Sequence, residues 1–231
     1  MAESPDPSAS SPTSRDRDRA RAIARSLLEI QAVDLRPDDP FEWSSGLFAP
    51  MYCDNRRTLA YPSIRSTIAE GLAETARDAS VLPATIAGTA TAGIPHAAWL
   101  AGRLDAPMCY VRSSTKGHGR KNRIEGVVEA GDPVVVVEDL ISTGSSALSA
   151  VDALREAGAD VRAVLAIFSY EFDRAADAFR EAGVPLHTLT GFRALLDVAT
   201  DAGHLTAAHI DALRDWRRDP DAWSDAVAAG R

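Results

Sequence analysis

The feature that most constrains the fold is a repeated alternation of short apolar runs with helical patterns after Pro83. Strands are predicted at 84–87, 107–111, 134–137, 161–168 and 186–189, and helices at 93–101, 145–156, 173–181 and 191–199. This alternation predicts an α/β fold, with a central parallel sheet that is covered by helices on both faces. In such sheets ligands bind at the carboxyl ends of the strands, so a site is expected in the loops there.

The segments before this alternation are less regular. Residues 1–17 consist largely of Ser, Pro, Asp and Arg, and we expect them to form a disordered tail. Helical patterns follow at 20–33 and 63–78, and FEWSSGLFAPMYCDNR between them predicts a hairpin-like piece. One more amphipathic helix and a turn at Pro220 are predicted near the C-terminus. We therefore expect a single domain at 18–231, with a core at 63–200 and C-terminal helices at 201–231.

Charge and composition argue against several classes of protein. The 231 residues carry a net charge of -8, whereas nucleic-acid and membrane surfaces attract basic proteins. The first residues lack the apolar core of a signal peptide, so a cytoplasmic protein is expected. Cys53 and Cys109 lack metal-ligand spacing and are expected to be reduced thiols. Only Lys116 and Lys121 are lysines among 25 basic residues, and Asp and Ala are frequent. This composition suggests a salt-adapted or GC-rich source, and we expect a halophilic archaeon.

The sequence VVVVEDLISTGSSA at 134–147 places two acidic residues at the end of a buried strand. Glu138 and Asp139 are followed by small hydroxyl residues around Gly144 and then by a predicted helix. The N–H groups of such a turn, the helix dipole and the hydroxyls can together bind a phosphate group. A ribose 5-phosphate fits, because its 2- and 3-hydroxyls can donate hydrogen bonds to the carboxylates. The alternative is an ordinary strand-to-helix turn with two solvated acids.

Two further loops follow predicted strands. RSSTKGHGRKNR at 112–123 contains both lysines and His118, and we expect a mobile loop that becomes ordered over an anion. A solvated basic loop is the alternative. GTATAGIP at 88–95 consists of small residues, so its backbone can approach a second phosphate group. Tight packing of the same residues under a helix is an equally good interpretation.

Taken together, VVVVEDLISTGSS resembles the phosphoribosyl-diphosphate binding motif of the type I phosphoribosyltransferases. Within that family, FEWSSGLFAPMYCDNR, GTATAGIPHA, YVRSSTKGHGRKNRIEG and IFSYEF are similar to segments of the orotate phosphoribosyltransferases. The resemblance implies the type I phosphoribosyltransferase fold, with a small hood formed by the N-terminal segment at 18–62. It also implies Mg2+-dependent transfer of ribose 5-phosphate from 5-phosphoribosyl 1-diphosphate to orotate, in de novo pyrimidine biosynthesis.

The resemblance further implies roles for particular residues. Lys116, His118 and Asp139 would be catalytic. The residues that contact phosphoribosyl diphosphate would be Arg112, Lys116, His118, Thr89, Ala90, Thr91, Glu138, Asp139, Leu140, Ile141, Ser142, Thr143, Gly144, Ser145 and Ser146. Mg2+ would bind through the substrate diphosphate, with no direct protein ligand. A homodimer is implied, in which the loop at 112–123 reaches the neighbouring site; no nucleic acid and no membrane is expected as a partner.

The chain departs from the family pattern where orotate would bind. Ser44, Ser113 and Ala92 stand where some members carry lysine, and IFSYEF lacks an arginine that others use on orotate. Ser142 lies where the family places a hydroxyl near the orotate ring. Arg56 is the candidate for the orotate carboxylate, because a guanidinium suits bidentate recognition. A structural ion pair is an equally good interpretation of Arg56.

Two rival functions stay open on the sequence. One is a phosphoribosyltransferase for a purine or another base, which the first segment and the KGHG loop disfavour. The other is a non-catalytic regulator of the same fold that senses the donor. A regulator needs a DNA-binding module, whereas residues 1–40 contain one helical pattern and no helix-turn-helix.

Overall fold

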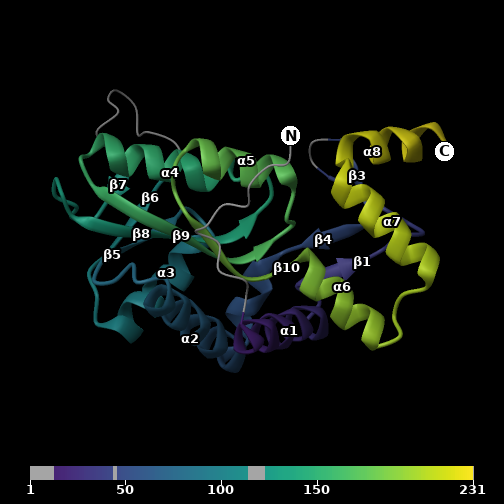
Figure 1. Ribbon diagram of the computed structural model, residues 1–231, viewed down its shortest axis with the longest axis horizontal. Helices are drawn as coiled ribbons and strands as arrows, with labels where there is room; N and C mark the ends of the chain where they lie inside the picture. The colour runs from purple at the N-terminus through teal and green to yellow at the C-terminus, as the bar shows by residue number, and fades with distance from the viewer. Residues whose placement is uncertain (1–12, 44–45, 114–122, 231) are drawn as a thin grey trace, which may run out of the picture.

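The computed structural model describes residues 13–43, 46–113 and 123–230. Its centre is a six-stranded sheet with the order β10-β9-β8-β5-β6-β7, which is parallel except for the antiparallel pair of β6 and β7 (Figure 1). The strands are β5 (Thr85–Thr89), β6 (Met108–Val111), β7 (Ile124–Glu125), β8 (Pro133–Ile141), β9 (Asp160–Ser169) and β10 (Leu186–Gly191). The predicted parallel α/β sheet is confirmed; β7 is an addition that no sequence pattern indicated.

Helices cover both faces of this sheet (Figure 1). One face carries α1 (Ser14–Glu29), α2 (Pro62–Asp78), α3 (Gly93–Leu104) and α6 (Phe192–Asp201), and the other carries α4 (Ser145–Glu156) and α5 (Asp173–Glu181). The valines of β8 supply both cores, because successive side chains of a strand point to opposite faces. Val135 and Val137 belong to the first core, and Val134 and Val136 belong to the second.

Helix α1 begins within the segment for which a disordered tail was expected. The hydroxyl of Thr13 accepts a hydrogen bond from the backbone N–H of Asp16, whose carboxylate accepts one from the N–H of Thr13. Arg19 pairs with Asp16 at 2.7 Å and with Glu74 of α2 at 3.0 Å. Residues 14–17 are therefore helical, because this capping box and these ion pairs stabilise a segment with little apolar content. Residues 1–12 of the expected tail lie outside the described residues.

The segment between α1 and α2 forms short strands and one 3-10 helix. They are β1 (Val33–Leu35), β2 (Phe41–Glu42), β3 (Phe48–Ala49), β4 (Met51–Cys53) and η1 (Asn55–Ala60). β1 pairs with β4, and β2 pairs with β3 in a hairpin, both antiparallel. The predicted hairpin-like piece is confirmed. The helix predicted at 20–33 ends at Glu29, and Val33 belongs to β1. From here on the name hood, which the resemblance gave to 18–62, is used for residues 33–43 and 46–60 only.

The C-terminal part contains two helices, α7 (Ala207–Arg218) and α8 (Pro220–Ala229). The turn predicted at Pro220 separates them, because proline ends one helix and is accepted at the first position of the next. The carboxylate of Asp219 caps α8 by accepting a hydrogen bond from the N–H of Ala222 at 3.0 Å. Figure 1 shows α8 beside β3 of the hood. None of the helices in the described ranges is both long and apolar enough to cross a membrane.

Candidate functional site

A cleft of about 1010 Å³ opens between the hood and the carboxyl ends of β5 and β8. The hood supplies Phe41, Glu42, Trp43, Tyr52, Cys53, Asp54 and Arg56 to its lining. The loop between β5 and α3 supplies Ala90, Thr91 and Ala92, and the remaining lining residues are Glu138, Asp139, Leu140, Ser142, Ser146 and Tyr170. The cleft therefore brings together the acids, the start of α4 and the small-residue loop, as the strand-end argument predicted.

The cleft exists because β8 extends beyond its neighbour β5. The last pair between the two strands joins Gly88 to Val137, whereas β8 stays paired with β9 as far as Ile141. The end of β8 consequently has one open edge. Glu138 and Asp139 lie on this part of β8, inside the strand rather than after it as the shorter predicted strand at 134–137 implied.

Glu138 is buried, and the adjacent Asp139 is half-buried. Glu138 is 5% exposed; its Oε1 accepts a hydrogen bond of 3.1 Å from the N–H of Asp139, and its Oε2 has no hydrogen-bond partner among the described residues. Burial raises the pKa of Glu138, and the neighbouring Asp139 carboxylate raises this pKa further. Burial likewise raises the pKa of Asp139. Such acceptors are satisfied by a ligand that brings hydroxyl donors.

The start of α4 lies beside these acids and has the features of a phosphate site. Gly144 precedes the helix with a φ of 83°, a conformation that favours glycine. A Cβ atom there would also lie 2.7 Å from the ring of Phe179. The hydroxyls of Thr143 and Ser145 are hydrogen-bonded at 3.1 Å, and Ser146 is exposed. Because the first N–H groups of a helix have no partner within it, they can bind an anion together with these hydroxyls.

The loop between β5 and α3 packs closely on β8. A Cβ atom at Gly93 would lie only 2.4 Å from the backbone oxygen of Val137, so only glycine allows this approach. Ala90 and Thr91, which are joined by a cis peptide bond, line the cleft. Thr89 is buried and is not among the lining residues. Two of the three residues predicted in this loop therefore lie in the cleft.

The basic segment after β6 is described only at its ends. The side chain of Arg112 is 24% exposed and lies 3.7 Å from an oxygen of Glu125. The N–H of Arg112 donates to the backbone oxygen of Arg123 at 2.8 Å, and Nε of Arg123 donates back to the oxygen of Arg112 at 2.9 Å. Arg112 is not among the residues that line the cleft. The predicted catalytic residues Lys116 and His118 lie outside the described residues.

Arg56 lies in the cleft and also forms an ion pair. Its Nε donates to Oδ1 of Asp54 at 2.6 Å, and its Nη2 donates to Oδ2 of the same carboxylate at 3.1 Å. Arg56 therefore forms the ion pair that one of the two interpretations expected. Its side chain is nevertheless 64% exposed and lines the cleft. Asp54 accepts hydrogen bonds from Nε and Nη2, so the two N–H donors of Nη1 make no bond in this ion pair.

Several residues at the cleft received no role from the sequence. Asn55 is fully buried, and its Nδ2 donates to the backbone oxygen of Asp139 at 2.6 Å. Tyr170 is 3% exposed, and its ring centroid lies 5.7 Å from that of Trp43. Both motifs that contain these residues, CDNR and IFSYEF, stand out in the sequence. The sequence does not indicate the roles of Asn55 and Tyr170, because their contacts join residues far apart in the chain. The partners of the Asn55 bond, for example, are separated by 84 positions.

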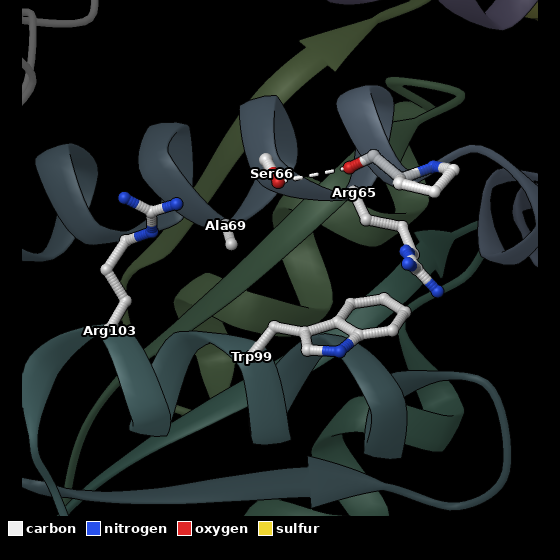
Figure 2. A pocket seen from close by; sticks show the side chains of 6 residues that line it. Arg65, Ser66, Ala69, Trp99 and Arg103 are labelled. Atoms are coloured by element: carbon white, nitrogen blue, oxygen red, sulfur yellow. Dashed lines mark hydrogen bonds between the residues drawn. The ribbon is translucent and has the colours of Figure 1, made fainter.

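A second cavity, of about 400 Å³, lies between α2 and α3 and shares no lining residue with the cleft (Figure 2). It is lined by Pro62, Arg65, Ser66, Ala69, Trp99 and Arg103. The guanidinium of Arg65 lies 4.9 Å from the ring centroid of Trp99, and Arg103 pairs with Glu70. No carboxylate lines this cavity, whereas the larger cleft contains Glu138 and Asp139, so the larger cleft is the candidate site.

Known proteins share this architecture. A family model described as the phosphoribosyl transferase domain matches residues 59–184. An orotate phosphoribosyltransferase from Halalkalibacterium halodurans is 52% identical over 202 residues, which cover 87% of this chain and 96% of the relative. The crystal structure of orotate phosphoribosyltransferase from Aeropyrum pernix aligns with a TM-score of 0.68 and 31% identity, over 80% of this chain and 99% of that one.

A third match is the Mycobacterium tuberculosis H37Rv orotate phosphoribosyltransferase in complex with 5-phospho-alpha-D-ribosyl 1-diphosphate. It aligns with a TM-score of 0.60 and 25% identity, over 78% of this chain and 98% of that one. Curated relatives that are 52% identical come from Halalkalibacterium halodurans and Bacillus cereus, so the suggestion of a halophilic archaeal source is not supported. By the extent of the family match and by its identity with these relatives, the chain belongs to the phosphoribosyltransferases and, among them, to the orotate phosphoribosyltransferase family.

Proposed function

We propose that the protein is a Mg2+-dependent orotate phosphoribosyltransferase. It transfers ribose 5-phosphate from 5-phosphoribosyl 1-diphosphate to N1 of orotate and releases diphosphate and orotidine 5'-phosphate, a step of pyrimidine biosynthesis. The identity of 52% with a curated orotate phosphoribosyltransferase along most of both chains supports this activity. The solved relative with 5-phospho-alpha-D-ribosyl 1-diphosphate supports the donor.

The observation that carries the proposal is the placement of a buried and a half-buried carboxyl group beside the start of a helix in one cleft. Glu138 and Asp139 lie at the open edge of β8, and the residues from Ser142 to Ser146 lead into α4. The acids accept hydrogen bonds from the 2- and 3-hydroxyls of ribose. The hydroxyls and N–H groups at the start of α4 hold the 5-phosphate. Leu140 and Ile141 keep the two parts at a fixed separation, because both belong to β8.

The chemistry requires no nucleophile from the protein. The anomeric carbon passes through a cation-like state as the bond to diphosphate breaks and the bond to N1 forms. The orotate nitrogen reacts as its anion, so no proton needs to be removed at this step. Asp139 lies beside the sugar in this arrangement, and its negative charge stabilises the developing positive charge. Ordering of the basic loop over the bound donor, as the sequence predicts, would exclude water, which would otherwise hydrolyse the donor.

The leaving diphosphate needs positive charge and N–H donors. Arg112, Lys116 and His118 supply the charge from the basic loop. In the opposite loop Thr91 supplies a backbone N–H, because Thr89 does not line the cleft and the N–H of Ala90 donates to the backbone oxygen of Val111 at 2.8 Å. Mg2+, carried on the diphosphate, neutralises further negative charge when it is bound. No protein carboxylate is assigned to the ion, because Glu138 and Asp139 serve the sugar.

The base lies on the hood side of the cleft, since the β8 side is taken by the donor. The Nη1 group of Arg56 and the hydroxyl of Ser142 are the proposed contacts with orotate, and both residues line the cleft. The ion pair with Asp54 orients the guanidinium and leaves part of it for the orotate carboxylate. Arg56 is therefore assigned a double role.

We also propose a cytoplasmic homodimer in which each basic loop serves the neighbouring site. Arg112 is outside the lining of the cleft in its own chain, as expected for a loop that acts on another copy. Mixing an inactive loop variant with an inactive variant at Asp139 tests this arrangement. Partial recovery of activity in the mixture is expected, because one site per heterodimer combines two intact contributions; no recovery would contradict sharing.

The assay that tests the function contains protein, orotate, 5-phosphoribosyl 1-diphosphate and Mg2+, and follows the loss of orotate absorbance. Conversion that requires all three additions is expected. Unchanged orotate, with transfer to a purine base in a parallel reaction, would assign the protein to a different acceptor. Absence of any transfer, with a shift of DNA in a gel, would favour the donor-sensing regulator.

A further inference from the structure

The C-terminal helices α7 and α8 lie beyond residue 184, where the match to the family model ends. We propose that Ser224 of α8 and Trp216 of α7 position the hairpin β2–β3, which forms the wall of the cleft that faces the acceptor base. The identity of the acceptor rests on the proposed function. The positioning itself rests on contacts within the described chain.

The hairpin is too small to hold its own position. Its ladder consists of the pairs Phe41–Ala49 and Glu42–Phe48. An isolated hairpin of this kind is at best marginally stable in water. Phe41, Glu42 and the adjacent Trp43 nevertheless line the cleft. The position of this wall must therefore be fixed by contacts from outside the hairpin.

The first such contact is a hydrogen bond from β3 to α8. The backbone N–H of Phe48 donates to Oγ of Ser224 at 2.9 Å, across 176 positions of sequence. Ser224 is 4% exposed, so water does not compete for this bond. The cap by Asp219 and the proline at the first position fix where α8 starts. They thereby fix which strand residue Ser224 meets in the hairpin.

The second contact is aromatic and lies behind the wall. Trp216 is 1% exposed, and its ring meets the ring of Trp43 edge-on at a centroid distance of 6.0 Å and that of Tyr170 at 5.5 Å. Trp43 and Tyr170 line the cleft, whereas Trp216 does not. One buried residue of α7 therefore sets the spacing of two rings that a ligand would meet, without touching the ligand.

These contacts concern the base and not the donor. The groups assigned to the donor belong to β8, the start of α4 and the loop after β5. None of these elements is held by Ser224. A displaced hairpin should therefore weaken orotate binding and leave the affinity for the donor and the rate of the bound complex unchanged.

The test compares Ser224→Ala with Thr206→Ala. Thr206 caps α7 and contacts the N–H of His209, so its loss weakens the same helical unit without removing a bond to the hairpin. Ser224→Ala should raise the KM for orotate about five- to tenfold, the effect of one lost hydrogen bond, with kcat and the KM for the donor unchanged. Amide hydrogen exchange at Phe48 should become faster in Ser224→Ala only.

A wild-type KM for orotate in Ser224→Ala, or an equal rise in Thr206→Ala, would overturn the proposal. Trp216→Phe gives a second measurement if Ser224→Ala does not fold, and the same rise in the orotate KM alone is expected. Failure of the proposed function is distinguishable, because the wild-type protein would then not use orotate. Exchange at Phe48 would in that case still decide whether Ser224 holds the hairpin.

Discussion

Nδ2 of Asn55 donates a hydrogen bond of 2.6 Å to the backbone oxygen of Asp139, and this bond joins the hood to the strand that carries both acids. Asn55 is fully buried and is held from two sides. Its Oδ1 faces the thiol of Cys53 at 3.5 Å, and its backbone oxygen accepts a hydrogen bond from the hydroxyl of Thr58 at 2.6 Å. The hood and Asp139 therefore keep a fixed relative position.

Asn55→Ala should destabilise the protein by about 1–3 kcal/mol, because a buried backbone oxygen loses its donor. Denaturant unfolding measures this change directly. Leu59→Ala is the control, since Leu59 lies on the same 3-10 helix and is 36% exposed. Unfolding of Asn55→Ala at the wild-type midpoint would show that the bond to Asp139 contributes nothing.

Glu138→Gln should change how stability depends on pH. Burial and the Asp139 carboxylate raise the pKa of Glu138 in the folded protein from 4.5 to about 8. When the folded-state pKa is the higher one, the protonated group contributes its full stability below the pKa of the unfolded chain. This contribution is lost as the pH rises through the pKa of the folded protein. The melting temperature of the wild type should therefore fall, relative to Glu138→Gln, between about pH 4.5 and pH 8.

Thermal unfolding of both proteins across this range, at constant ionic strength and without ligand, measures the effect. Both proteins are compared at each pH, so titrating groups that do not interact with Glu138 cancel. A difference in melting temperature that does not vary with pH would contradict the raised pKa.

Gly93→Ala should lower the stability of the folded protein and Gly102→Ala should raise it, although both change a glycine of α3. At Gly93 the new Cβ would meet the oxygen of Val137 at 2.4 Å, which should cost about 1–3 kcal/mol and move the strand that carries Glu138. At Gly102 no atom lies within 4 Å, so the better helix former should stabilise α3 by up to about 1 kcal/mol. Denaturant unfolding and donor affinity are measured for both variants. A loss of stability in Gly102→Ala would contradict the prediction.

Lys116→Ala should reduce kcat by orders of magnitude with little change in melting temperature, because the lysine is assigned to the leaving diphosphate. Lys121→Ala removes the other lysine of the chain, to which no role is assigned, and is the matched control. Steady-state kinetics with orotate measures both variants. Normal turnover in Lys116→Ala would remove this residue from the mechanism.

The sequence allowed the layers and the donor side to be predicted, because both depend on local patterns. The four valines before Glu138 alternate between two cores, and the residues from Ser142 to Ser146 lead into α4, whose predicted bounds are those observed. The extent of β8 was underestimated, since acids are rare in buried strands. An open strand edge follows from the different lengths of β5 and β8, and no local pattern indicates that difference.

The acceptor side could be predicted only in part. The sequence predicts a role for Arg56, yet the buried residue next to it, Asn55, makes the long-range bond. Likewise, IFSYEF differs from the family by lacking an arginine, whereas its Tyr170 joins an aromatic group with Trp43 and Trp216. Such contacts depend on how distant elements meet, which propensity and periodicity do not report.

The bond between Phe48 and Ser224 also sets an order of assembly during synthesis. The strands and the helix that hold the donor side precede residue 170, so they have left the ribosome well before α8 has been made. Phe48 must wait for a partner that emerges 176 residues later. A nascent chain can thus complete one half of its cleft early, while the other half is fixed only when α8 docks.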